Sequence, residues 1–262
     1  MKNLRVLSVV AVMILFSAVA CKKDAQRARL TVYLTDAPAS YDAVNIQLRE
    51  VQVKASTENS ENGWQSLPLA VSPVTYNLLE FKNGMEALLS SVELPAGRIS
   101  QIRLILGNNN SIVVNGVAES LPIDIPSGQQ TGLKLNIHAD LEAGVEYKLW
   151  IDFDVARSII LNGNGDYILK PVIRTFTEAS SGAIKGVVLP AAANAIVSVS
   201  NGIDTYGAIP DAVTGEFLVR GVPPGVWTVT LDGNNGYIDQ VINNVPVGLG
   251  EITDVGSKTL VQ

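Results

Sequence analysis

The sequence predicts an all-β fold of two antiparallel β-sandwich domains, the first with one short helix and the second smaller. Three observations carry this prediction. Apolar residues recur at every second position from residue 30 onward, which is the period of a half-buried strand. Asn-Gly and Asp-Gly pairs, which favour tight turns, stand repeatedly between these runs. The 262 residues, 47% of them hydrophobic, suffice for two domains with separate cores.

The first 20 residues predict a lipoprotein signal peptide. Lys2 and Arg5 precede an uncharged run, Val6–Ala20, which is shorter than the ~20 residues that span a bilayer as a helix. The segment Ser17–Cys21 resembles the lipobox of bacterial lipoproteins, in which the cysteine is diacylated and becomes the new N-terminus. We therefore predict a lipid on Cys21 that anchors the chain to a membrane. The alternative is an ordinary signal peptide, which would leave Cys21 as a free thiol.

Residues 21–29 are predicted to form a lipidated tether. Lys22, Lys23 and Asp24 resemble the lysine-plus-acid signals of lipoproteins that the Bacteroidota send to the outer face of the outer membrane. We therefore expect an outer-membrane lipoprotein of the cell envelope, with exposure at the cell surface as a further expectation. The alternative is that these charges only solvate the tether.

The first predicted domain covers residues 30–177. Its first strand alternates from Arg29 to Thr35, and its second changes parity at Arg49-Glu50, which predicts a β-bulge. The further strands that we expect in this domain are Ile99–Leu106, Ser111–Val114, Leu121–Ile125, Leu133–His138, Val145–Val155 and Ile168–Phe176.

One segment of this domain has the spacing of a helix. Met85, Leu88, Leu89 and Val92 fall at i, i+3, i+4 and i+7. Asn83 stands three residues before Glu86, in capping-box order. We therefore predict a short helix over residues 85–92 that crosses one end of the sheets.

Residues 178–182 are small and polar, and they predict a linker. The second predicted domain follows at residues 183–262. The strands that we expect in it are Ala183–Leu189, Ala195–Ser200, Glu216–Arg220, Val226–Leu231 and Gly256–Leu260.

The first domain resembles a bacterial family of unknown function, domain of unknown function family 4382. Four segments carry the resemblance: LTDAPASYDAVNIQL (Leu34–Leu48), LPAGRISQIRLIL (Leu94–Leu106), KLWIDFDVARSI (Lys148–Ile159) and LKPVIRTF (Leu169–Phe176). The family has no established activity, so the resemblance implies no catalytic residue.

The second domain resembles the carboxypeptidase regulatory-like, transthyretin-like β-sandwiches. The segment TGEFLVRGVPPGVWTVTL (Thr214–Leu231) carries this resemblance, and its Pro-Pro-Gly predicts a rigid turn between two strands. The resemblance implies a carbohydrate-binding-like fold, although a fold by itself does not imply a function.

The strongest candidate for chemistry is a pair of carboxylates on one strand. Trp150, Asp152 and Asp154 alternate with apolar residues and therefore share one face. Carboxylates two positions apart lie roughly 6–7 Å from each other. Such a pair could serve glycoside hydrolysis or bind calcium.

The preceding strand offers further polar groups. Asn136 and His138 lie on its polar parity, and the two strands could pair through the loop of residues 139–144. A face with an indole, two carboxylates, an amide and an imidazole could stack against a sugar and hydrogen-bond it. The alternative is the solvated side of an antiparallel sheet, which alternates in the same way.

Several classes of site are excluded or disfavoured. His138 is the only histidine and Cys21 the only cysteine, which excludes multi-histidine and multi-cysteine metal sites. No G-x-S-x-G elbow accompanies the histidine, which argues against a serine hydrolase. No phosphate-binding loop or dinucleotide fingerprint is present. We therefore expect no catalytic residue, no metal and no cofactor.

The predicted function is that of a non-enzymatic envelope lipoprotein that presents binding modules, with a glycan as the ligand. The net charge of −6 argues against a nucleic-acid partner. One alternative is a structural or assembly protein of the outer-membrane surface that acts through another envelope protein. A second alternative is a glycan-acting hydrolase that uses Asp152 and Asp154.

Overall fold

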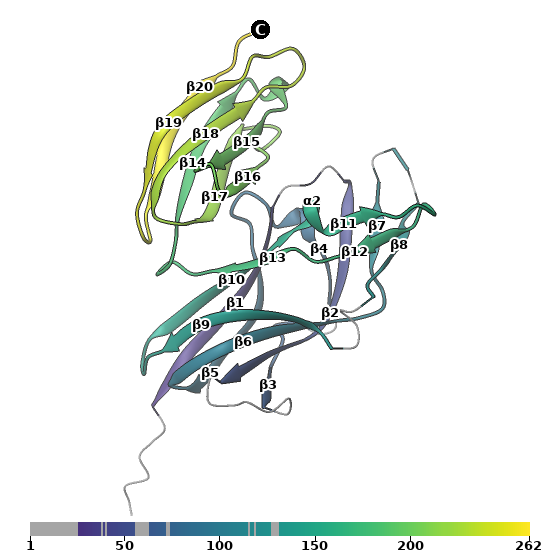
Figure 1. Cartoon of the computed structure of the whole chain (residues 1–262), viewed down its shortest axis with the longest axis vertical. Coiled ribbons are helices and arrows are strands. Elements are labelled where there is room, and N and C mark those ends of the chain that lie inside the picture. Colours follow the sequence, from purple (N-terminus) through teal and green to yellow (C-terminus); the bar gives the residue numbers. More distant parts are fainter. Residues whose placement is uncertain are drawn as a thin grey trace, which may run out of the picture.

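The computed structural model describes residues 26–37, 39, 41–55, 63–71, 74–114, 116–117, 119–126 and 131–262. Most of these residues form strands, which confirms the all-β prediction (Figure 1). The predicted signal peptide and Cys21 lie outside the described residues. Within the described ranges, no helix is long and apolar enough to cross a membrane.

The first sheet is a mixed sheet of four strands. Its order is β13 (Ile173–Phe176), β10 (Glu146–Asp154), β1 (Arg27–Ala37) and β5 (Ala87–Pro95). β1 pairs with β10 in parallel and with β5 antiparallel. The apolar alternation of β1 buries Leu30, Val32 and Leu34 against the second sheet.

The second sheet has nine strands with β2 at its centre. Its members are β11 (Ile159–Leu161), β12 (Tyr167–Leu169), β8 (Leu121–Asp124), β7 (Ser111–Val113), β2 (Ala43–Ala55), β6 (Gly97–Leu106) and β9 (Leu133–Leu141), with β3 (Trp64–Leu67) and β4 (Val74–Asn77) also paired to β2. The bulge predicted at Arg49-Glu50 is confirmed, because the β2–β6 register shifts between Leu48 and Glu50.

The C-terminal residues form two further sheets. One has the order β17 (Glu216–Val222), β14 (Gly182–Leu189), β20 (Ile252–Thr259), and the other β16 (Thr205–Ala208), β15 (Ile196–Ser200), β18 (Gly225–Asp232), β19 (Gln240–Val247). Buried apolar residues form two clusters, one within residues 28–169 and one within residues 184–260. Each cluster lies between a pair of sheets, as in a β-sandwich.

The helix predicted over residues 85–92 is wrong, because most of this segment is strand β5. The β1–β5 register shifts between Val32 and Tyr33, so that β5 carries an extra residue there. This bulge changes the parity of β5, and Leu89 and Leu94 are both buried although five positions separate them. Met85 and Leu88 of the helical pattern are exposed, so the four apolar residues do not form one buried face.

The helical segments among the described residues are short and lie elsewhere. They are η1 (Leu78–Glu80), α2 (Val155–Ser158) and η2 (Ala191–Ala193). The Asp154 carboxylate accepts a hydrogen bond from the Arg157 backbone N–H at 3.0 Å, and it thereby caps α2 at the end of β10.

Candidate functional site at the domain junction

The structure does not bring the five predicted site residues together. β9, which carries Asn136 and His138, pairs with β6 in the nine-stranded sheet. β10, which carries Trp150, pairs with β1 and β13 in the other sheet. The predicted pairing of these two strands is therefore wrong. The strand that pairs with β10 in its place is β1, which lies more than 100 residues away in sequence.

The alternation predicted for β10 is correct, but its second face is covered. Leu149, Ile151 and Phe153 point into the core, and Trp150 lies on the opposite face. Trp150 is nevertheless only 3% exposed, because that face packs against the C-terminal domain. A sugar cannot stack on a ring buried in this way.

Trp150 is held on both sides by other rings. Its ring stacks on Tyr33 with centroids 5.5 Å apart and on Phe176 with centroids 5.6 Å apart. The indole N–H donates a hydrogen bond to Glu86 Oε2 at 2.7 Å. Arg220 of the C-terminal domain pairs with the same Glu86 oxygen at 3.3 Å. The indole is therefore part of the contact between the two domains.

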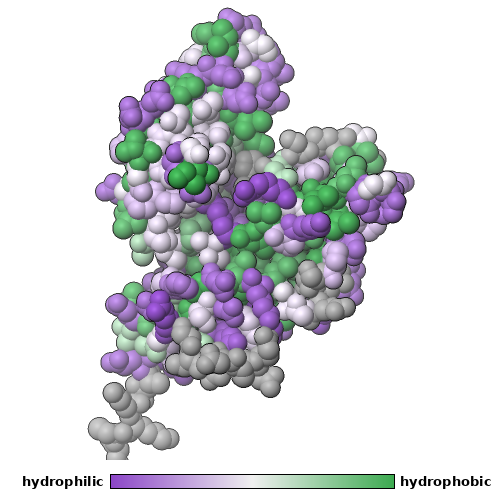
Figure 2. Space-filling model, viewed as in Figure 1, coloured by the Kyte–Doolittle hydropathy of each residue, from purple (hydrophilic) through white to green (hydrophobic). Residues whose placement is uncertain are grey.

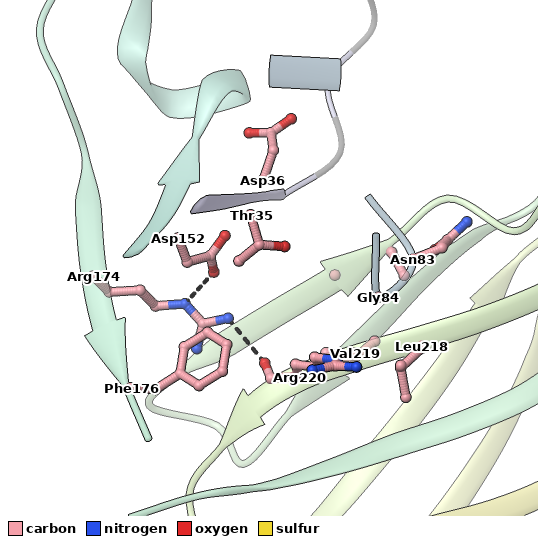
Figure 3. Close-up of a pocket in the computed structure, with 12 residues that line it drawn as sticks. Thr35, Asp36, Asn83, Gly84, Asp152, Arg174, Phe176, Leu218, Val219 and Arg220 are labelled. Carbon is pink, nitrogen blue, oxygen red and sulfur yellow. Dashed lines mark hydrogen bonds and ion pairs between the residues drawn. The ribbon is translucent and has the colours of Figure 1, made fainter. Parts of the chain in front are cut away.

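Arg174 of β13 connects the first domain to the second through its guanidinium group (Figure 3). Its Nε donates to Asp152 Oδ2 at 2.6 Å. Its Nη1 and Nη2 donate to the backbone carbonyl oxygens of Gly221 and Arg220 at 2.8 and 3.1 Å. The group also lies 4.2 Å from the ring centroid of Tyr206. One planar cation thus binds a carboxylate in one domain and the backbone of the other.

Asp152 is 4% exposed and depends on this contact. Burial raises the pKa of its carboxyl group, while the Arg174 guanidinium acts in the opposite direction. A buried ion pair adds little net stability over an apolar pair of similar volume, but removing one partner leaves a charge uncompensated. Removing either Arg174 or Asp152 alone would therefore leave the other charge without its partner.

Asp154 does not share a site with Asp152. Its Oδ2 accepts a hydrogen bond from Arg157 Nε at 2.6 Å, in addition to the cap of α2. Each of the two carboxylates has its own arginine, so the pair that the sequence suggested is divided between two structural roles.

Asp36 is a further buried carboxyl group next to this junction. The parallel register of β1 and β10 places Asp36 opposite Phe153 and next to Asp152 in space. Its Oδ1 accepts a hydrogen bond from the Val155 backbone N–H at 3.3 Å, and its Oδ2 is buried without a partner among the described residues. Burial first, and then the Asp152 charge, raise the pKa of Asp36 to about 9. The carboxyl group is therefore protonated at neutral pH.

Two hollows border the junction. A cavity of about 20 Å³, large enough for about one water molecule, is lined by Thr35, Asp36, Asp152, Arg174 and residues of β16 and β17. A groove of about 860 Å³ separates the segment that precedes β5 from the outer face of the β17–β14–β20 sheet. Met85 stands on one of its walls and Ile252 on the other, and both side chains are exposed.

The junction also depends on residues that sequence reasoning missed. Arg174, Glu86 and Arg220 make contacts between segments that are distant in sequence, for which no local pattern exists. Asp36, in contrast, could have been noticed from the sequence. It falls on the same parity of β1 as Leu34, so a carboxyl group continues an otherwise apolar face.

No group of three or more metal-binding side chains occurs among the described residues. We therefore assign no metal position to the junction.

Comparison with known proteins identifies part of the chain. A family model described as "Domain of unknown function (DUF4382)" matches residues 27–171. No curated protein matches the sequence.

Several solved structures show a distant likeness. The Bacillus anthracis TIE protein is 10% identical with a TM-score of 0.23, over 90% of this chain and 34% of that one. A leucine-rich repeat protein from Bacteroides thetaiotaomicron is 13% identical with a TM-score of 0.21, over 90% and 26%. The minor pilin GBS52 of Streptococcus agalactiae is 10% identical with a TM-score of 0.23, over 88% and 96%. The chain thus spans about a third or less of the first two, and TM-scores this low carry no argument about function.

Proposed function

Since the chain belongs to the DUF4382 family, whose model matches residues 27–171, we propose that it is a non-enzymatic, lipid-anchored envelope protein that binds a glycan. The non-enzymatic part of the proposal rests on the contacts at the junction between the two domains. Its carboxylates, arginines and stacked rings are used to fix one domain against the other. Groups held in this way stabilise a structure and are poorly placed to turn over a substrate.

The position of the chain ends supports a presenting role. β1 begins at the lower end of the molecule, and the C-terminus lies at the opposite end (Figure 1). Only the five residues 22–26 would join a lipid on Cys21 to β1, and the six steps from Cys21 to Arg27 reach at most about 20 Å. The first domain would then lie next to the membrane and would hold the C-terminal domain away from it. The resemblance of that domain to carboxypeptidase regulatory-like modules fits this role.

Lipidation is tested by Cys21→Ser in the full-length chain. We expect the wild-type protein to incorporate a radioactive fatty acid at Cys21. We also expect it in the membrane pellet, because two or three acyl chains bind a bilayer far more firmly than one. The variant should lose the label and leave the membrane pellet. A wild-type chain without label, or a variant that remains firmly membrane-bound, would contradict the anchor.

Glycan binding is tested by an array of purified polysaccharides and the chain without residues 1–21, which contain none of the described elements. We expect retention on at least one glycan. Trp150→Phe should leave this retention unchanged, because the ring at position 150 is buried in the junction. Absence of retention on every glycan would contradict this part of the proposal, whatever the outcome for Cys21.

A second candidate function, contact with another envelope protein, is favoured by one surface. β11 is an edge strand, and its Ile160 and Leu161 are 39% and 58% exposed. Figure 2 shows hydrophobic side chains gathered around β11 and β12. An exposed apolar edge is typical of a surface that another chain covers.

A further inference from the structure

We propose that a hollow at the start of strand β18 binds an uncharged polysaccharide. The hollow lies in the C-terminal domain, and we call it the Asn244 hollow after one of the residues that line it. The proposal deepens the proposed glycan-binding function and rests on it. It names both the place of the site and the class of glycan.

Three neighbouring strands form the Asn244 hollow, in the sheet that contains β15, β18 and β19 in the upper part of the molecule (Figure 1). β15 ends at the hollow, and β18 begins there. Its volume is about 400 Å³, within the usual range for a ligand site. All of the lining lies within residues 131–262, which the structure describes without a gap. The side chains that line it are Ser200, Asn201, Val226, Trp227, Thr228 and Asn244.

A β-bulge places two asparagines of β19 beside the hollow. The β18–β19 register shifts between Trp227 and Val229, so that Asn243 and Asn244 both lie opposite Thr228. Asn244 has a φ of 58°, a left-handed backbone conformation that is uncommon for residues other than glycine. Bulges change the direction of side chains and are frequent next to functional sites. The extra residue thus brings the Asn244 amide to the hollow.

The Asn244 hollow offers amide groups that the described chain leaves without a partner. Asn201 Oδ1 accepts hydrogen bonds from the backbone N–H groups of Ile203 and Asp204 at 2.9 and 2.7 Å. The Nδ2 of Asn201 and the whole side-chain amide of Asn244 form no hydrogen bond with the described residues. An amide both donates and accepts hydrogen bonds, as a sugar hydroxyl does, so these groups can bind the hydroxyls of a sugar.

The side chains that line the hollow are all uncharged. The acidic residue nearest to them in sequence is Asp204, which does not line the hollow. An uncharged site provides no cation to offset the cost of removing a carboxylate from water, so this lining favours a neutral polysaccharide over an acidic one. The other sheet of the same domain, β17–β14–β20, differs in this respect, because its outer face carries Lys185, Glu216, Arg220 and Asp254.

The lining suits a sugar better than an apolar protein partner or a membrane. Val226 is 62% exposed, whereas Trp227 is only 2% exposed and donates its indole N–H to Pro223 O at 2.9 Å. Apolar partners and membranes are bound by several exposed apolar side chains together. A single exposed apolar side chain among hydroxyl and amide groups instead matches a sugar ring, which presents C–H groups beside its hydroxyls.

The proposal is tested by affinity electrophoresis of the chain without residues 1–21. The neutral probes are laminarin, galactomannan, xyloglucan and amylopectin, and the acidic probe is polygalacturonate. We expect binding to at least one neutral polysaccharide and none to polygalacturonate. Added sodium chloride should change the binding less than about twofold, because salt screens ionic contacts and no ionic contact is proposed here.

Asn244→Gly removes the amide from the hollow, and Asn235→Gly is the matched control. Both asparagines have a left-handed backbone, with φ of 58° and 56°, which glycine adopts without strain. Asn235 lies in the same domain, but its Nδ2 donates to Ala192 O outside the hollow. We expect Asn244→Gly to weaken binding of the neutral polysaccharide about tenfold and Asn235→Gly to change it less than about twofold. Unchanged circular dichroism of both variants would show that the sheets are intact.

Three outcomes would overturn the proposal. Unchanged binding by Asn244→Gly, or equal loss in the two asparagine variants, would leave a glycan-binding protein whose site lies elsewhere. Binding to polygalacturonate or other acidic glycans of the array, without binding to a neutral one, would reject the neutral ligand and keep the proposed function. Binding to no glycan at all would reject the proposed function together with this site.

Discussion

Replacing Arg174 with Met is expected to lower the free energy of unfolding by about 3–5 kcal/mol, because the substitution leaves a buried carboxylate without its cation. Asp152 is 4% exposed, and Arg174 Nε lies 2.6 Å from its Oδ2. Methionine fills a similar volume, so the loss would come from the charge and the hydrogen bonds and not from a cavity. Urea denaturation of the purified chain measures the effect.

The matched control is Arg157→Met. Arg157 also pairs with an aspartate at 2.6 Å, but its side chain is 66% exposed, so we expect a loss below about 1 kcal/mol. The double variant Asp152→Asn with Arg174→Met should be more stable than Arg174→Met alone, because it removes the orphaned charge. Equal stability of the two single arginine variants would contradict the role given to the buried pair.

Arg174→Lys separates the two functions of the side chain. Lysine keeps the positive charge next to Asp152, but it cannot present the planar fork that reaches both Gly221 O and Arg220 O. We expect most of the stability to be retained while the domains lose their fixed arrangement. Small-angle X-ray scattering and the rate of proteolysis between residues 177 and 182 would report this change. An unchanged scattering profile would show that other contacts fix the domains.

The strands could be predicted from the sequence because their information is local. The alternation of β10 correctly placed Ile151 and Phe153 inward and Trp150 outward. The change of parity at Arg49-Glu50 likewise indicated a real bulge. What alternation cannot tell is whether the outward face meets water or another domain. Trp150 and Asp152 were therefore assigned to the correct face and to the wrong environment.

The failures have the same physical origin. The apolar spacing of residues 85–92 matches a helix, and only the pairing of β5 with β1 decides in favour of a strand. The neighbour of β10 is β1, in parallel, although proximity in sequence favoured β9. Long-range pairing also brings Arg103 and Lys54, which come from different strands, to the indole of Trp64. No single segment of the sequence contains that arrangement.

Asp36→Asn is expected to stabilise the protein above neutral pH. The pKa of Asp36 is about 9 in the folded protein, against 3.8 for an ordinary aspartate. Between these two pKa values, Asp36 is therefore protonated in the folded chain and ionised in the unfolded chain. Stability is highest below the unfolded pKa and is lost as the pH rises toward 9, by up to about 1.4 kcal/mol per pH unit. Asparagine stays neutral in both states and has almost the same shape, so its stability should not decline in this way.

The measurement is urea denaturation of wild type and Asp36→Asn between pH 5 and pH 8.5, with the exposed Glu142→Gln as the control. Because Asp152 and Lys82 also act on Asp36, the comparison uses the difference between the two chains, in which other titrating groups largely cancel. We expect that difference to be small at pH 5 and to grow steadily in favour of the variant. Glu142→Gln should follow the wild type at each pH. A difference that is constant with pH would mean that Asp36 is ionised in the folded protein, and its buried oxygen would then require a cationic partner.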